Sequence, residues 1–224
     1  MATQRKLVFV NNYIYHVYNR GIDERDIYLC KKDYLRFIEL LKFYNSNSTK
    51  ISYSKFIKLS QKDKDKFVQQ HDQSGNLIEI LAYCLMPNHF HLLLRQSLDG
   101  GITKYLSNVA NAYAQYFNLK YKRKGTLYQG AFKAVFIESD AQLTHMSRYI
   151  HINPVVSSLV ELSKLECYPW SSLKYYLNST GSDFVNSKLV LSYFGSIEKY
   201  KNFIYDQIDY GKELEKIKHA INDY

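Results

Sequence analysis

His89 and His91 are the residues whose type and spacing most directly suggest metal chemistry in this sequence. In a β-strand, residues i and i+2 project from the same face, so both imidazoles would point one way and Phe90 toward a core. Two neutral imidazoles this close can converge on one divalent cation. The alternative is a pair of solvent-facing or hydrogen-bonded histidines, which the spacing alone does not exclude.

A second group of polar residues lies on one face of a predicted helix. Tyr149 and Asn153 are four residues apart, and His145 precedes Tyr149 by the same spacing, so the three side chains share one helical stripe. If this stripe faces the histidine pair across a groove, His89, His91 and Asn153 would supply three metal ligands. The alternative is that Tyr149 packs in the core and Asn153 caps the helix.

The predicted ligand set determines the chemistry that the site would support. A mixed nitrogen and oxygen site suits Mg²⁺ or Mn²⁺ acting on a phosphate, although imidazole would equally suit zinc. The metal would polarise the scissile phosphate and stabilise charge on the leaving oxygen. A tyrosine hydroxyl, with an ordinary pKa of about 10, needs such help or a base to attack. Attack by Tyr149 would give a covalent phosphotyrosine intermediate that retains the bond energy for rejoining.

Apolar runs and turn residues predict the elements that must position these side chains. The string Met86-Pro87-Asn88 joins two apolar runs and predicts a tight turn between paired strands over 77–85 and 90–95. A helix capped by Ser139 or Asp140 is expected to carry Tyr149 and to continue through Ile152, and Pro154 is expected to end it. The other expected elements are a strand over 13–18, a helix from the cap Asp33 to about Tyr44, a helix over 102–122 and a strand over 134–137.

The order of these elements predicts an α+β sandwich, in which one antiparallel sheet has helices packed on it. Residues 46–76 are rich in Ser, Lys, Gln and Asp and are expected to form an exposed insertion with a short helix near 58–70. Residues 155–224 are expected to be helical, with one segment starting at Ser171 or Ser172 and a Tyr-rich helix from about Ile197. We therefore predict a catalytic domain over 1–154 and a helical extension over 155–224 packed on it.

The composition is that of a folded protein, with 46% hydrophobic and 23% charged residues. No run approaches the roughly 18 apolar residues of a membrane span, and the first residues lack the apolar stretch of a signal peptide. We therefore expect a cytoplasmic protein with no membrane association. Cys30, Cys84 and Cys167 show no disulfide or zinc spacing and are expected to be reduced.

The charge balance predicts a polyanionic partner. The net charge is +9, and the 22 tyrosines offer stacking faces for bases. Lys120, Lys122, Arg123 and Lys124 form a basic segment that could bind a nucleic-acid backbone, although such a run is also typical of a solvated helix end.

Four strings of the sequence form a recognisable set: Pro87–Leu93, Gly125–Lys133, Arg148–Val155 and Tyr168–Ser172. Taken together, they resemble the HUH-type single-tyrosine transposases, and the branch associated with repetitive extragenic palindromes is the most similar. Each string occurs at a spacing compatible with that family, and the shorter strings Tyr18-Asn19-Arg20-Gly21 and Asp26-Ile27-Tyr28 also fit it. The resemblance runs in order from about residue 12 to residue 177.

The resemblance implies a ferredoxin-like HUH fold with Tyr149 as nucleophile and His89 and His91 as metal ligands. Asn153 matches the position of a third ligand. Substrates in that family are single-stranded DNA beside an imperfect hairpin, the tyrosine becomes linked to the 5′ end, and a 3′-hydroxyl is freed. The expected cofactor is Mg²⁺ or Mn²⁺, and a monomer and a homodimer are both compatible with the sequence. Basic residues beside the motifs, which are the better candidates for DNA contacts, are Arg20, Lys133 and Arg148, and expected neighbours of the site are Tyr128, Gln129 and His145.

Two departures from the family pattern remove positive charge. Ala131 stands where family members often carry Arg, so that Lys133 or Arg148 would have to compensate if that Arg contacts phosphate. Residues 156–159 also replace a more usual Arg-Ala-Gly-Leu pattern. Two other functions stay open: a non-catalytic, domesticated binder of hairpin DNA or RNA, and a metal-dependent RNA phosphoesterase.

Overall fold

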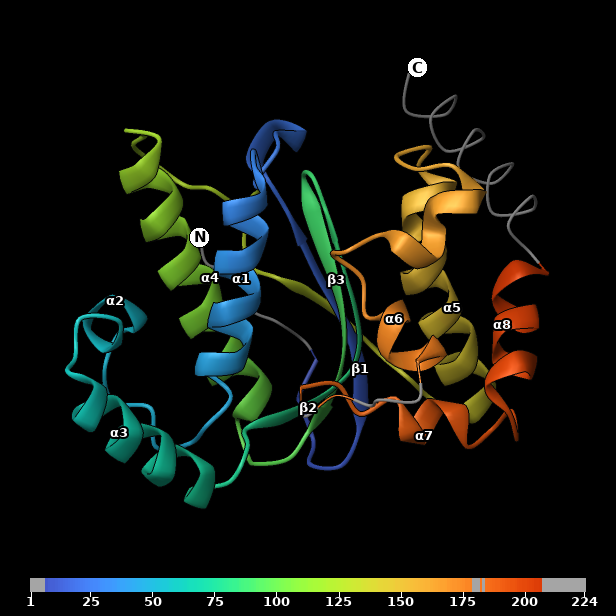
Figure 1. The fold of residues 1–224 in the computed structure, drawn as a ribbon, viewed down its shortest axis with the longest axis horizontal. Helices are drawn as coiled ribbons and strands as arrows, with labels where there is room; N and C mark the ends of the chain where they lie inside the picture. Colours follow the sequence, from blue (N-terminus) through green and yellow to red (C-terminus); the bar gives the residue numbers. More distant parts are fainter. Residues whose placement is uncertain (1–6, 179–181, 183, 207–224) are drawn as a thin grey trace. The chain divides into compact units, whose positions relative to one another are not determined.

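A computed structural model describes residues 7–178, 182 and 184–206 of the chain (Figure 1). The chain forms two compact units. The first comprises the described residues up to Glu79, together with Pro87–His89 and Leu94–Val135. The second comprises Ile80–Met86, Phe90–Leu93 and the described residues from Phe136 onward.

Four strands form one antiparallel sheet with the order β2-β3-β1-β4. The strands are β1 (Ile14–Arg20), β2 (Ile78–Met86), β3 (His89–Gln96) and β4 (Lys133–Phe136). The predicted strand pair with a turn at Pro87 and Asn88 is therefore confirmed, and so is the α+β class. Strand β2 is buried along nearly its whole length, which fits its almost continuous apolar sequence.

The core of the first unit is a pair of helices, α1 (Lys31–Phe43) and α4 (Gly101–Lys120), which lie side by side (Figure 1). Two buried tyrosines of α4 bond to main-chain oxygens: Tyr105 donates to Leu41 at 2.9 Å and Tyr113 to Ile27 at 2.5 Å. Gly101 starts α4 against the chain at Leu77, because a Cβ here would lie 2.3 Å from the Leu77 carbonyl oxygen.

The start of α1 differs from the prediction. Cys30, and not Asp33, is the N-cap residue, and Asp33 occupies the third helical position. The Asp33 carboxylate accepts bonds from the main-chain nitrogens of Leu29 and Cys30 at 2.9 and 3.1 Å. The side chain thus caps the helix from within its first turn, as the acidic residue of a capping box does. A short 3-10 turn, η1 (Ile22–Glu24), lies between β1 and α1.

The insertion over 46–76 contains two helices, α2 (Tyr53–Phe56) and α3 (Gln61–Gln73), where one short helix was expected. Its anchor is aromatic, since the Phe43 ring at the end of α1 contacts the rings of Tyr53, Phe56 and Phe67 at centroid distances of 5.0 to 5.4 Å. The insertion therefore has a small packed cluster of its own and is attached to α1.

The second unit is built around α5 (Asp140–Val156). The Ser139 hydroxyl accepts a bond from the Gln142 nitrogen at 3.2 Å, which confirms the predicted cap. The predicted end of this helix at Ile152 was wrong, because α5 continues to Val156 with Pro154 inside it. Proline removes only its own N–H donor and its φ is already helical, and the next turn closes with the Ser157 nitrogen bonded to the Asn153 oxygen at 3.0 Å.

The described residues beyond 155 pack on α5 and on the middle of β2. They form η2 (Leu162–Cys167), α6 (Leu173–Leu177), α7 (Lys188–Leu191) and α8 (Ile197–Tyr205). Tyr168 and Tyr176 donate to the main-chain oxygens of Leu85 and Leu81 at 2.7 and 2.6 Å. The division into a catalytic domain over 1–154 and an extension over 155–224 stays a prediction, and residues 207–224 lie outside the described part.

Two further observations concern the chain as a whole. Among the helices that the structure describes, none is long and apolar enough to cross a membrane. Cys30, Cys84 and Cys167 are free thiols, and Cys84 is buried.

Candidate active site

The second unit brings the predicted nucleophile against a predicted metal ligand. The rings of Tyr149 and His91 contact each other edge to face, with centroids 5.4 Å apart and planes at 80°. His91 lies on β3 and is 6% exposed, whereas Tyr149 on α5 is half-buried. Strand and helix therefore hold a phenol and an imidazole in direct contact, with part of the phenol reachable from solvent.

Asn153 lies on the same helix, four residues after Tyr149, and is 7% exposed. Its main-chain oxygen accepts bonds from the nitrogen and hydroxyl of Ser157 at 3.0 and 2.7 Å. Its side-chain amide has no hydrogen bond to any other residue that the structure describes. Because α5 continues past it, Asn153 does not cap the helix end, and its amide oxygen is left for another partner.

His89 lies in the first unit at the start of β3, and its neighbour fixes its tautomer. The ring atom Nδ1 is 2.6 Å from Asn88 Oδ1, and the Asn88 amide nitrogen donates to the Glu24 main-chain oxygen at 3.1 Å. Since Oδ1 can only accept, Nδ1 carries the proton of this bond. An oriented imidazole with one donated N–H is the usual state of a metal-binding histidine.

The predicted donors are of a chemical kind that suits a divalent cation. The His89 ring is oriented by Asn88, and the side-chain amide of the 7% exposed Asn153 has no hydrogen bond to a described residue. The described residues contain no group of three or more His, Cys, Asp and Glu side chains that could hold a metal. The predicted set of two imidazoles and one amide is of a different kind, and its remaining positions would suit water and phosphate oxygens.

Three of the motif strings meet at the end of β1 within the first unit. Gly21 stands at this junction, and a Cβ there would lie 2.2 Å from the Arg25 main-chain oxygen, so only glycine fits without movement. The bonds that join the strings are Gly21 N to Asn88 O at 2.8 Å, Gln129 N to Arg20 O at 3.0 Å, Ile22 N to Leu127 O at 3.0 Å and Asn19 Nδ2 to Gly130 O at 3.0 Å.

This junction also places two predicted neighbours of the site. Tyr128 is 8% exposed and pairs with Gly21 in an isolated bridge, and burial raises the pKa of its hydroxyl well above the ordinary range. A raised pKa leaves less of the Tyr128 hydroxyl ionised at neutral pH. Gln129 is exposed beside Arg20.

The predicted DNA-binding residues fall into two groups. Arg20, Lys122, Lys124 and Lys133 are exposed, and Arg20 forms a surface ion pair with Glu24 at 2.5 Å. Exposed cations of this kind can exchange a surface partner for a phosphate at little cost. Residue Ala131 is also exposed, where the family pattern has Arg.

Lys120 belongs to the second group, since its charge is already paired. Its ammonium contacts the fully buried Asp33 at 2.5 Å and lies 4.8 Å from the Tyr121 ring centroid. Burial lowers the pKa of Lys120, but the bonds to Asp33, Tyr121 and Cys30 outweigh this and raise it overall. The same bonds outweigh the effect of burial on Asp33 and lower the pKa of its carboxyl. Lys120 therefore holds α4 to the start of α1.

Arg123 and Arg148 are likewise engaged. The Arg123 guanidinium lies 5.6 Å from the Phe117 ring centroid. Arg148 is 6% exposed, lies 4.0 Å over the Phe203 ring, and donates to the Phe203 oxygen at 3.1 Å. Its second terminal nitrogen is 2.7 Å from Nδ1 of the exposed His145. A phosphate contact by Arg148 would therefore require α8 to move away from it.

His151 forms a buried hydrogen-bond network that sequence reasoning missed. His151 is fully buried, with Nδ1 2.7 Å from the Tyr200 hydroxyl and Nε2 2.8 Å from the Ser172 hydroxyl. Ser172 in turn accepts from the Tyr83 nitrogen of β2 at 2.8 Å. This network ties the helix that carries Tyr149 to α8 and to the sheet. In the sequence, the Ser171-Ser172 pair was the feature that could have indicated this network.

Comparison with known proteins adds independent support. Residues 48–153 match the family model described as "Transposase IS200 like", and that span contains His89, His91, Tyr149 and Asn153. A solved REP-associated tyrosine transposase bound to a REP hairpin aligns with a TM-score of 0.55 at 15% identity, covering 83% of this chain and 98% of that one. The chain resembles the HUH-type tyrosine transposases.

The resemblance gives this transposase-like chain its fold class, an antiparallel HUH-type sheet with packed helices. A candidate transposase from Deinococcus radiodurans R1 aligns with a TM-score of 0.35 at 15% identity, over 67% of this chain and 95% of that one. No curated protein matches the chain.

Proposed function

We propose that the chain is a metal-dependent strand transferase that cleaves single-stranded DNA near hairpins through a 5′-phosphotyrosine at Tyr149. The family match supports a transposase-type function in general. The observation that carries the finer proposal is the contact between Tyr149 and His91, with ring centroids 5.4 Å apart. It brings Tyr149, the one tyrosine of α5, to the strand that begins with the two proposed metal ligands.

In this proposal, Tyr149 Oη attacks the phosphorus atom of the scissile phosphate. Tyr149 gives up its hydroxyl proton to solvent as a P–O bond to the tyrosine forms. The bond to the 3′ oxygen breaks, and that oxygen takes up a proton from solvent and leaves as a 3′-hydroxyl. The phosphodiester energy is kept in the phosphotyrosine, so attack by another 3′-hydroxyl can rejoin the strands.

His89, His91 and Asn153 would hold the divalent cation, Mg²⁺ or Mn²⁺. When bound, such a cation supplies charge for the scissile phosphate and the leaving oxygen. Asn88 orients the His89 ring by accepting the proton on Nδ1, and α5 sets Asn153 one turn after Tyr149. Because Asn153 and Tyr149 share one helix, a cation bound to Asn153 would lie at a distance from Tyr149 that the helix sets.

The proposed substrate is hairpin DNA, as in the solved relative with a REP hairpin. The exposed cations Arg20, Lys122, Lys124 and Lys133 would neutralise phosphates. A protein that cleaves DNA must be located where the DNA is, and we propose that this is the cytoplasm. A monomer and a homodimer are both compatible with this function.

A fluorescent hairpin oligonucleotide with Mn²⁺ tests the proposal. The wild-type chain should give a covalent protein–DNA band on a denaturing gel, and Tyr149→Phe should abolish it. Tyr193→Phe, at a 45% exposed tyrosine of the same unit, is the matched control and should leave the band unchanged. Binding without an adduct would support the non-catalytic binder instead, and RNA cleavage that survives Tyr149→Phe would point to a phosphoesterase.

A further inference from the structure

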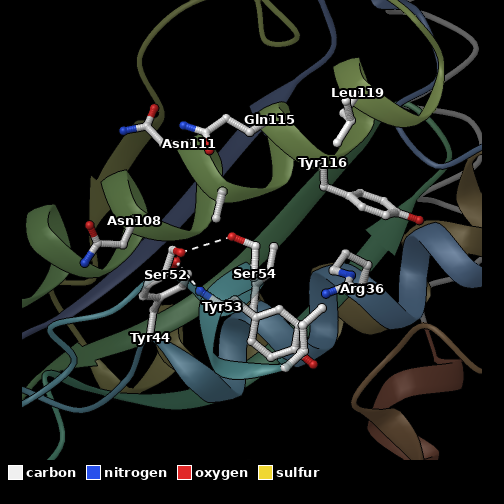
Figure 2. Close-up of a pocket in the computed structure, with 13 residues that line it drawn as sticks. Arg36, Tyr44, Ser52, Tyr53, Ser54, Asn108, Asn111, Gln115, Tyr116 and Leu119 are labelled. Carbon is white, nitrogen blue, oxygen red and sulfur yellow. Dashed lines mark hydrogen bonds between the residues drawn. The ribbon is translucent and has the colours of Figure 1, made fainter. Parts of the chain in front are cut away.

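A cavity of about 370 Å³ lies in the first unit, away from every motif string. It is bounded by α1 and α4 and is closed by the start of the insertion around α2 (Figure 2). Its volume is in the range of about 300–1,000 Å³ that is usual for small-molecule sites. The insertion, which sequence reasoning gave no chemistry, therefore builds a pocket.

Three amide side chains of α4 line the cavity. Asn108, Asn111 and Gln115 follow one another along the helix, and Figure 2 shows them in a row on the same side. Asn108 is half-buried and the other two are exposed. None of the three side chains has a hydrogen bond to another residue in the described part of the chain. Each amide therefore offers both a donor and an acceptor to a ligand.

The other side of the cavity offers flat stacking groups. The Arg36 guanidinium lies 4.8 Å from the Tyr53 ring centroid and 5.0 Å from the Tyr116 ring centroid. Burial, helped by the nearby Glu39 charge, raises the pKa of Tyr53 to about 12. Its hydroxyl is thus neutral at physiological pH, and the ring stays an uncharged platform. Planar groups of this kind stack on bases of any sequence.

We propose that this cavity binds an unpaired base of single-stranded DNA. Side-chain amides match the donor and acceptor pattern of base edges, and the tyrosine and arginine planes supply the stacking surface. The inference rests on the proposed function in taking DNA as the ligand. It assigns the insertion a role in gripping the unpaired strand next to the hairpin.

The exposed cations near the cavity favour a polyanionic occupant over a neutral peptide. Among polyanions, the flat stacking groups favour a DNA strand over an acidic peptide. Leu119 lines the end of the cavity, and the chain continues directly from it to the exposed Lys122 and Lys124. These lysines would contact the phosphates that follow the bound base. The Arg36 charge at the pocket itself is paired with Glu39 at 3.7 Å, so Arg36 contributes a flat stacking group rather than net charge.

Fluorescence anisotropy in the Tyr149→Phe background, which prevents cleavage, tests the proposal. The probes are a blunt hairpin oligonucleotide and the same hairpin with a single-stranded extension of about eight nucleotides. Asn111→Ala/Gln115→Ala should weaken binding of the extended probe about tenfold or more and leave the blunt hairpin unchanged. Gln69→Ala/Gln70→Ala, at exposed amides on α3, is the matched control and should change neither affinity.

A direct readout accompanies the affinities. With 5-iodouracil in the extension, irradiation should cross-link the DNA to Tyr53 or Tyr116, and digestion with mass spectrometry locates the link. Equal affinities for the extended probe in the double variant and in the control would overturn the proposal, as would cross-links confined to other residues.

The two proposals fail separately. Loss of affinity in the pocket variant without any Tyr149 adduct in the parent chain would keep the pocket and reject the nuclease. An adduct at Tyr149 with no contribution from the pocket would do the reverse.

Discussion

One ring nitrogen of His89, Nδ1, is hydrogen-bonded to the side chain of Asn88. The amide of Asn88 bonds to the His89 ring at 2.6 Å and to the Glu24 main chain at 3.1 Å, so its own orientation is fixed. In the proposed site, this turn residue would position His89 as a metal ligand. Its removal should affect metal affinity more than folding.

The first prediction is that Asn88→Ala raises the Mn²⁺ concentration needed for half-maximal adduct formation by about 10- to 100-fold. The physical reason is that the His89 ring loses the acceptor that selects its tautomer. Adduct yield across a Mn²⁺ titration measures this. Asn202→Ala, at an exposed amide on α8, is the control. An unchanged Mn²⁺ dependence in Asn88→Ala would remove Asn88 from the mechanism.

At the scale of elements, α5 is held in place from two directions. His151 bonds to Tyr200 of α8 on one side and to Ser172 on the other, and Ser172 bonds to β2. These bonds set the position of the helix that carries Tyr149 and Asn153. A buried imidazole that loses one partner keeps an unsatisfied nitrogen, which costs free energy.

The second prediction follows from that cost. Tyr200→Phe should lower the free energy of unfolding by about 1–3 kcal/mol, as measured by urea denaturation. The matched control is Tyr205→Phe, which removes a surface bond to Glu166 and should cost under about 1 kcal/mol. Equal losses in the two variants would show that the network does not hold α5.

The third prediction concerns His16 on β1, which makes the free energy of unfolding depend on pH. Burial lowers the pKa of His16 from 6.5 to about 4. Between these values the unfolded chain binds a proton that the folded chain does not, so stability falls as the pH drops, by at most about 1.4 kcal/mol per pH unit. His16→Gln should flatten the slope of unfolding free energy against pH in this window. Equal slopes in His16→Gln and in the wild-type chain would contradict the assignment.

Local patterns predicted the elements where the deciding signal is itself local. The turn at Pro87-Asn88, the Ser139 cap and the strand that carries His91 are all set by neighbouring residues. The end of α5 was predicted wrongly because Pro154 was taken as a stop. A proline near a helix end is tolerated when the following turn closes through other bonds, and the sequence pattern does not reveal those bonds.

At the scale of the whole molecule, the net charge of +9 is divided between paired and free cations. The sequence predicted a continuous basic segment over 120–124, but Lys120 is bound to the buried Asp33 while Lys122 and Lys124 are exposed. Only the exposed members can exchange water and salt ions for phosphate. The segment therefore contributes fewer DNA contacts than its sequence suggests.

The fourth prediction puts a number on that contribution. Lys122→Ala/Lys124→Ala should reduce the slope of log affinity against log salt concentration by about 1.4, since each phosphate contact to single strands contributes about 0.7. Fluorescence anisotropy at several salt concentrations measures the slope. Lys62→Ala/Lys66→Ala, on the exposed face of α3, is the control. A slope that is the same in both variants would place the DNA elsewhere.

The candidate site was predictable from the sequence where it depends on local spacing, and not where it depends on distant contacts. Histidine spacing on a strand and tyrosine–asparagine spacing on a helix are periodic features that a sequence shows directly. The burial of Arg148 under Phe203 joins residues that are 55 apart in the chain, and no local pattern encodes such a contact. The same holds for the pocket, which needs α1, α2 and α4 together.

The central claim is that Tyr149 attacks a DNA phosphate, and peptide mapping of the adduct tests it most directly. The wild-type chain is incubated with hairpin DNA and Mn²⁺, trapped, and digested with nuclease and protease for mass spectrometry. The account predicts one modified peptide, with a 5′-phosphonucleotide on Tyr149. A nucleotide on any other tyrosine, or cut DNA with no modified tyrosine, would contradict it.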